Sequence, residues 1–224
     1  MYISKTRHLL YITDIDRSGP SGRMEHLSCF FPGLIALGLH ILPDSIYESA
    51  DEKLVFQYAA EGLAHTCWVL YADQATGVGP DEVVFQPYDP NEWESGRWIN
   101  HASEWIALGK PEGKLKGVHK LSPPRRGKLD LPLDYEYTKP IYLMRPEVRL
   151  VRPNCGLDAV TDACGQTIES VYLMWKTTGN SIWRERGWDM FQSVQKYSTV
   201  PGGGMASIAD VRTTTHGVLD DMPR

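Results

Sequence analysis

The sequence predicts an all-α fold, built as an array or toroid of helix pairs. Several segments repeat apolar residues at the three- and four-residue steps of a helix, and the last two of these segments are separated by Asn180 alone. Helix pairs of similar build favour helix-on-helix packing around one core. The chain has 224 residues, of which 42% are hydrophobic and 23% charged, so we expect one sizeable globular domain.

Four helices are predicted in chain order. The first covers residues 33–42, after a kinking Phe-Pro-Gly, and the strongest covers residues 54–74, where apolar side chains recur until "TGVGP" ends the pattern. Residues 167–179 form the third, closed by Gly179, and residues 181–200 the fourth, with Ser181 as its N-cap. The short connection predicts that the last two form a tight antiparallel hairpin.

Periodicity fails between residues 80 and 144, although this stretch holds three of the seven tryptophans, Trp93, Trp98 and Trp105. We interpret the stretch as a binding surface or an insertion without a helical stripe. Its locally basic part, residues 110–128, lacks interleaved aromatics and is rich in Pro and Gly, so we expect a solvated loop there.

Composition excludes several classes of function. The net charge of −5 argues against general affinity for nucleic acid, and no apolar run reaches the roughly 18 to 20 residues that a membrane span needs. We expect no targeting signal in these residues. The four cysteines lack the close paired spacing of a zinc site, and a bond between Cys29 and Cys67 stays open at this point.

Few residues point to chemistry by themselves. Glu147 and Glu169 are acidic residues at predicted helix starts, where the helix dipole favours them, and His26 reads as a hydrogen-bonded structural histidine. The run "PGGGMAS" lacks the Gly-Lys-Ser/Thr ending of a phosphate loop, so it predicts a turn. The residue types alone therefore give a helical protein with scattered carboxylates.

Five segments taken together indicate a specific protein family. In chain order they are "MEHLSCFFPGLIALG", "AEGLAHTCWVLYADQATGVGPDEV", "YLMRPE", "TIESVYLMWKTTGN" and "GWDMFQSVQKYSTVPGGGMASIADV". They cover 84 of the 224 residues, and in this order they resemble glycoside hydrolase family 47. These are the inverting, calcium-dependent class I α-1,2-mannosidases that trim N-glycans.

The resemblance implies an (αα)7 barrel, here incomplete, in which helix ends converge on a Ca²⁺ ion and a mannose. It implies catalytic roles for Glu147, as the base that activates water, and for Asp81, one methylene shorter than the family's usual Glu. Arg145, His26 and Glu169 match residues at the substrate, and the family's disulfide matches Cys29 and Cys67. Inversion needs two carboxyl groups on opposite faces of the sugar, and calcium takes oxygen ligands, so these residue types fit the chemistry.

The resemblance covers only part of the family domain. We expect residues 1–224 to be a partial domain that lacks the first half, with its general acid, and the C-terminal Thr that ligates calcium. Hydrolysis by this chain alone is therefore not expected. The implied ligands are high-mannose N-glycans on glycoproteins, and the implied location is the lumen of the endoplasmic reticulum or Golgi. The alternative, from another class, is a non-catalytic mannose-glycan-binding relative.

Residues 148–166 interrupt the family's Arg-Pro-Glu-Thr-x-Glu-Ser motif after Glu147. These 19 residues correspond to 57 in-frame nucleotides, and their codons permit a splice donor, a branch point and an acceptor. We interpret the segment as a retained intron, with a real loop insertion as the alternative. Sequencing of the transcript across this junction distinguishes the two. A translated segment would separate Glu147 from the helix that should orient it.

Overall fold

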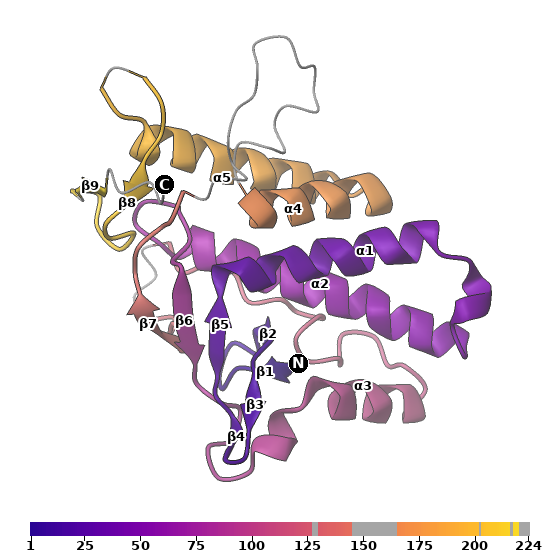
Figure 1. Cartoon of the computed structure of the whole chain (residues 1–224). Helices are drawn as coiled ribbons and strands as arrows, with labels where there is room; N and C mark the ends of the chain where they lie inside the picture. Colours follow the sequence, from indigo (N-terminus) through magenta and orange to yellow (C-terminus); the bar gives the residue numbers. More distant parts are fainter. Residues whose placement is uncertain (127–129, 145–164, 202, 216, 220–224) are drawn as a thin grey trace.

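The computed structural model describes residues 1–126, 130–144, 165–201, 203–215 and 217–219, with backbone alone at residues 165 and 166 (Figure 1). Its α-helices within these ranges are α1 (Phe31–Ile41), α2 (Ala50–Ala72), α3 (Trp98–Ala107), α4 (Gly165–Thr178) and α5 (Ser181–Ser198). The four predicted helices are confirmed as α1, α2, α4 and α5, with ends shifted by a few residues.

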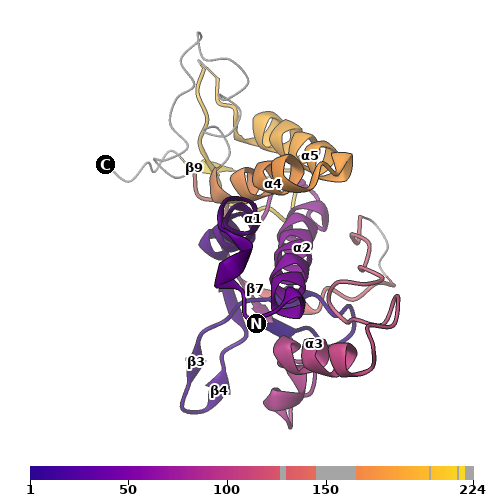
Figure 2. The same ribbon diagram turned by 90° about the vertical axis from the view of Figure 1, so that its right-hand side faces the viewer.

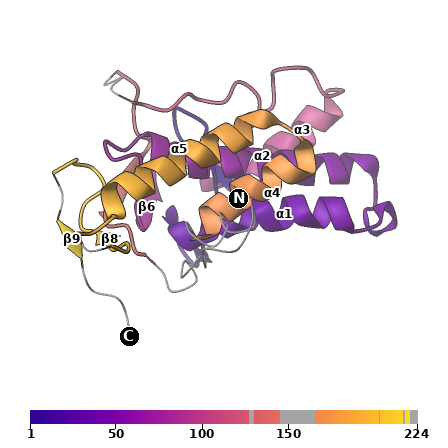
Figure 3. The same cartoon turned by 90° about the horizontal axis from the view of Figure 1, so that it is seen from above.

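The helices form two stacked pairs. The α4–α5 hairpin lies over the α1–α2 pair, with α4 against α1 and α5 against α2 (Figures 1 and 3). The apolar core between the pairs includes Ala64, Val171, Met174, Met190 and Val194, all at most 2% exposed. Burial of this kind contributes about 25 cal/mol per Å² of apolar surface, so it is the main force that holds the hairpin in place.

Caps determine where the helices begin. α2 begins at Ala50, earlier than predicted, because the Ser49 hydroxyl accepts a hydrogen bond from the backbone N–H of Glu52 at 3.1 Å. α5 is capped by Asn180, whose side-chain oxygen accepts from the Ile182 N–H, so the assignment of Ser181 as N-cap was wrong by one residue. Gly179 has φ +69°, the left-handed conformation that ends α4 as predicted.

The all-α prediction is wrong for the segments between the helices. β5 (Arg23–Glu25), β6 (Glu82–Phe85) and β7 (Tyr135–Lys139) form an antiparallel sheet in that order. Two-stranded ribbons join β1 (Tyr2–Ile3) to β2 (Leu10–Tyr11), β3 (Ile15–Asp16) to β4 (Gly19–Pro20) and β8 (Ser207–Ile208) to β9 (Val218–Leu219). The strands of two or three residues are too short to show a two-residue alternation, and the burial pattern of β6 does not alternate. Closure of the helix pairs into a barrel stays a prediction.

The stretch from 80 to 144 is more regular than predicted. It contains β6, β7 and α3, which lies on the far side of α2 from the α4–α5 hairpin (Figure 2). Trp98, Ala102 and Trp105 are buried along one face of α3, at helical spacing that we overlooked because Asn, His and Glu interrupt it. The basic segment is not a wholly solvated loop either, since Leu115 and Val118 join this core.

A buried histidine makes stability dependent on pH. His65, on α2, is 2% exposed, and its Nε2 lies 2.8 Å from the carbonyl oxygen of Ser122. Burial lowers the pKa of this imidazole to about 3, whereas an unfolded chain titrates near 6.5. The contribution of neutral, buried His65 to the free energy of unfolding is therefore complete above about pH 6.5, and it is lost progressively as the pH falls toward 3.

We expect His65→Gln to flatten the acid limb of the stability curve. Glutamine can keep a donor toward Ser122 but does not titrate, which removes a slope of up to about 1.4 kcal/mol per pH unit. Urea unfolding at several pH values between 7.5 and 4 measures this slope. Exposed His40, changed to Gln, is the control and should leave it unchanged. Equal slopes for wild type and His65→Gln would contradict the prediction.

Candidate active site

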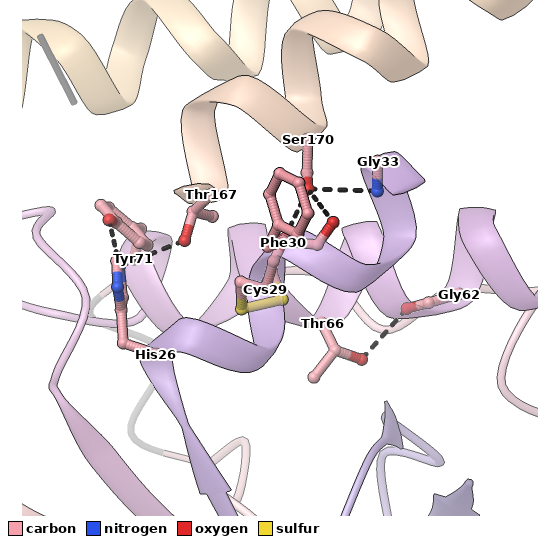
Figure 4. The surroundings of a disulfide bond; sticks show 10 residues. His26, Cys29, Phe30, Gly33, Gly62, Thr66, Tyr71, Thr167 and Ser170 are labelled. Carbon is pink, nitrogen blue, oxygen red and sulfur yellow. Dashed lines mark hydrogen bonds between the residues drawn. A yellow bond between two sulfur atoms is a disulfide. The ribbon is translucent and has the colours of Figure 1, made fainter. Parts of the chain in front are cut away.

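The candidate site begins where the sheet meets α1. The 3₁₀ helix η1 (His26–Phe30) leads from β5 into α1, and the disulfide between Cys29 and Cys67 ties it to α2 (Figure 4). The two Cα atoms are 5.8 Å apart, and both cysteines are 1% exposed. The pairing implied by the resemblance is confirmed, and it anchors His26 three residues away.

Ser170, in the second turn of α4, connects this helix to η1 and to the beginning of α1. Its hydroxyl donates to the carbonyl oxygens of Cys29, at 2.6 Å, and Phe30, at 3.1 Å, and accepts from the N–H of Gly33 at 3.1 Å (Figure 4). A Cβ atom on Gly33 would stand 2.6 Å from this hydroxyl oxygen and 2.7 Å from the Ser170 Cα. The segments "FPG" and "TIES" therefore meet with no room for a larger residue.

His26 lies at the centre of the site. Its Nε2 is 2.6 Å from the hydroxyl of Tyr71, on α2, and 3.1 Å from the hydroxyl of Thr167, on α4 (Figure 4). The ring of Tyr142 meets it edge to face, with the ring centroids 5.8 Å apart. Four segments that are distant in the sequence thus converge on one imidazole.

Asp81 is hydrogen-bonded to His26 through the backbone, where β5 ends. Its carbonyl oxygen accepts from the N–H of His26 at 2.8 Å, and its own N–H donates to the carbonyl of Ile141 at 2.7 Å. The neighbouring Glu82 faces Lys139, whose ammonium group lies 2.9 Å away and lowers the pKa of the Glu82 carboxyl. The Glu82 side chain therefore stabilises the pairing of β6 with β7. Asp81, which is 7% exposed, remains the candidate active-site carboxyl group.

The other predicted site residues divide into two groups. Glu169 is half-buried in the second turn of α4, between Thr167 and Ser170. Arg145 and Glu147 lie outside the described residues, as does most of the interruption at 148–166. The structure therefore brings together His26, Asp81 and the beginning of α4.

Comparison with known proteins relates this geometry to a family. The profile of glycosyl hydrolase family 47 matches residues 1–223 of the 224. This chain belongs to glycosyl hydrolase family 47. The recognition made on five short segments is thereby confirmed over almost the whole sequence.

Relatives of this family 47 chain carry the names of mannosidases. The chain is 28% identical over 199 residues to mannosyl-oligosaccharide 1,2-alpha-mannosidase MNS3 of Arabidopsis thaliana, covering 85% of this chain and 24% of that protein. It is 26% identical over 213 residues to the endoplasmic reticulum mannosyl-oligosaccharide 1,2-alpha-mannosidase of Homo sapiens, covering 93% and 21%. The chain thus spans less than a quarter of each of these relatives.

A solved structure shares the fold. The alpha-1,2-mannosidase from Trichoderma reesei superposes with a TM-score of 0.63 at 20% sequence identity, over 99% of this chain and 35% of that one. At this identity the likeness concerns the fold alone. It identifies the two stacked helix pairs as an arrangement found within a longer family 47 protein.

Clusters of metal-ligating His, Cys, Asp and Glu side chains are absent from the described part of this family 47 chain. In the ranges that the structure describes, no three His, Cys, Asp or Glu side chains gather where they could hold a metal ion, so we derive no step through calcium. None of the helices in these ranges could span a membrane. A cavity of about 800 Å³ lies between α5 and β7, and of the predicted site residues that the structure describes, His26, Asp81 and Glu169 do not line it.

Sequence reasoning missed Tyr71 and Thr167 as members of the site. Tyr71 falls in the apolar stripe of α2, and its ring is indeed 1% exposed, so its position alone marks it as core. Thr167 is fully buried in the first turn of α4. Only the folded chain shows that the hydroxyl groups of both residues face His26.

Proposed function

We propose that this chain is part of an α-1,2-mannosidase that removes terminal α-1,2-linked mannose from N-glycans with inversion. The family 47 match over residues 1–223 carries this proposal. The convergence of His26, Asp81 and α4 supports it, because these are positions that the resemblance assigns to the site.

The proposed chemistry uses two carboxyl groups. Glu147 removes a proton from the attacking water, and Asp81 lies among the acids around the sugar. Inversion requires the base and the general acid to stand roughly 6.5–9.5 Å apart, with space for that water between them. We expect the general acid to come from outside this chain. Arg145, His26 and Glu169 would bind and orient sugar hydroxyls through charged or neutral hydrogen bonds.

The proposal extends to a cofactor and a location. A Ca²⁺ ion would bind the oxygen atoms of sugar hydroxyls and of water as ligands. High-mannose N-glycans on glycoproteins would be the substrates, in the lumen of the endoplasmic reticulum or Golgi. The Cys29–Cys67 bond supports this location, because disulfides persist in oxidising compartments.

One observation favours the alternative, a mannose-glycan-binding relative without catalysis. Residues 148–166 stand between Glu147 and Thr167, so a chain that includes them does not carry Glu147 directly before the first turn of α4. Asp81 also has a shorter side chain than the Glu that is usual in the family. Binding needs only the sugar contacts, whereas hydrolysis needs both carboxyl groups within bond-making reach.

Incubation of the purified chain with α-1,2-mannobiose tests these proposals. We expect binding of the disaccharide and no release of mannose, because the general acid and the calcium-ligating Thr are both expected outside this chain. β-Linked cellobiose is the control ligand. Mannose release by the chain would refute the expected inactivity, and absence of mannobiose binding would contradict the proposed site. A longer protein containing this chain decides between the two functions: hydrolysis supports the enzyme, and binding without hydrolysis supports the alternative.

A further inference from the structure

We propose that Tyr71 and Thr167 are positioning residues that fix the tautomer and the orientation of the His26 imidazole. The inference rests on the proposed function, because His26 is taken as a contact to mannose. Neither hydroxyl group is offered here as a group that touches the sugar. Both act through His26, where three elements meet at one nitrogen atom.

The geometry places two hydroxyl groups on a single ring nitrogen. The Tyr71 oxygen lies 2.6 Å from His26 Nε2, and the Thr167 oxygen lies 3.1 Å from the same atom. Both distances are in hydrogen-bond range, and the Tyr71 contact is at the short end of that range. Figure 4 shows the two side chains approaching the ring from α2 and α4.

This arrangement favours one tautomer. A phenol or an alcohol can donate its proton to an imidazole lone pair, and the nitrogen that accepts carries no hydrogen. The Tyr71 phenol is a stronger hydrogen-bond donor than acceptor, so its short contact is assigned as an O–H···Nε2 hydrogen bond, with the proton of the neutral ring on Nδ1. The protonated nitrogen is a donor and the other an acceptor, so the tautomer decides how a sugar hydroxyl can be recognised.

Tyr71 is itself held in place. A Cβ atom on Gly79 would lie 2.5 Å from Cε2 of the Tyr71 ring, so the loop before Asp81 presses directly on this side chain. The ring is 1% exposed, and its centroid lies 5.6 Å from that of the His26 ring. Since Thr167 is also fully buried, neither hydroxyl can leave His26 without disturbing the packing.

Two conservative variants of the full chain test the proposal: Tyr71→Phe, which keeps the ring, and Thr167→Val, which keeps the shape. Long-range ¹H–¹⁵N spectra of histidine-labelled protein report the tautomer directly. We expect the Nδ1–H form of His26 in the wild type and a shift toward the Nε2–H form in Tyr71→Phe, with a smaller shift in Thr167→Val. Affinity for α-1,2-mannobiose should fall about tenfold in Tyr71→Phe, the effect of roughly one hydrogen bond.

Tyr58→Phe is the matched control, because Tyr58 lies on the same helix with its ring against Trp105. It should leave both the His26 spectrum and the affinity unchanged. An Nε2–H tautomer in the wild type, or an unchanged His26 spectrum in Tyr71→Phe, would overturn the inference. A wild type that shows the Nδ1–H form but binds no mannobiose would instead refute the proposed function, so the two failures are distinguishable.

Discussion

Replacement of Asp73 by Asn is expected to destabilise the protein by about 3–5 kcal/mol. The Asp73 carboxylate lies 2.6 Å from the Arg7 guanidinium, and the two side chains are 0% and 1% exposed. It also accepts a hydrogen bond from the hydroxyl of Tyr135 at 3.1 Å. Removal of the negative charge leaves the Arg7 cation buried without its compensating partner, which is the costly way to break an internal ion pair.

Urea unfolding of Asp73→Asn measures this cost. The matched control is Asp189→Asn, which breaks the ion pair with Arg126, where both side chains are more than half exposed. Surface pairs contribute about 0–1 kcal/mol, so the control should change stability little. Equal losses in the free energy of unfolding for the two substitutions would show that burial does not strengthen the Arg7–Asp73 ion pair. The double variant Arg7→Met, Asp73→Leu removes both charges and should recover part of the loss.

Loss of the Cys29–Cys67 disulfide is expected to cost about 4 kcal/mol in the double variant Cys29→Ala, Cys67→Ala. The bond spans 38 residues of sequence, and chain-entropy arguments give about this value for a loop of that length. The effect should reach the site, because His26 and the Ser170 contact to Cys29 belong to the same short segment. We therefore expect weaker mannobiose binding as well as a lower urea midpoint.

The chain contains its own control for this experiment. Cys155 and Cys164 lie in the interruption at 148–166, outside the described residues. If that segment is a retained intron and therefore foreign to the domain, Cys155→Ala with Cys164→Ala in a chain expressed with residues 148–166 included should leave the urea midpoint unchanged. A loss similar to that of the first pair would show that the segment takes part in the fold and would contradict the intron hypothesis.

The structure adds one observation to the question of residues 148–166. Tyr142, shortly before the interruption, and Thr167, directly after it, both contact His26. The two flanks of the interruption therefore lie close to each other. A chain in which Thr167 followed Glu147 would join Tyr142 to Thr167 through the five residues 143–147, which have roughly 17 Å of reach when extended.

The sequence was most informative where the pattern is long. α2 runs over 23 residues with apolar side chains at helical steps, and Gly179 marks the end of α4 without ambiguity. The short elements could not be predicted, because β5 and β6 have three and four residues and α3 mixes its tryptophans with polar neighbours. For the site, the recognised motifs gave His26, Asp81 and Glu169, and the disulfide pairing followed from the same resemblance.

The sequence by itself determined the paired helices through local periodicity, and it determined the family, and with it the implied cysteine pairing, through the resemblance of its ordered motifs. Only the tertiary structure decided which side chains serve His26. Tyr71 is separated from it by 45 residues and Thr167 by 141, so nothing local relates them. Their contact results from the packing of α4 against α1 and from the disulfide to α2. Long-range packing of this kind cannot be predicted from a short window of sequence.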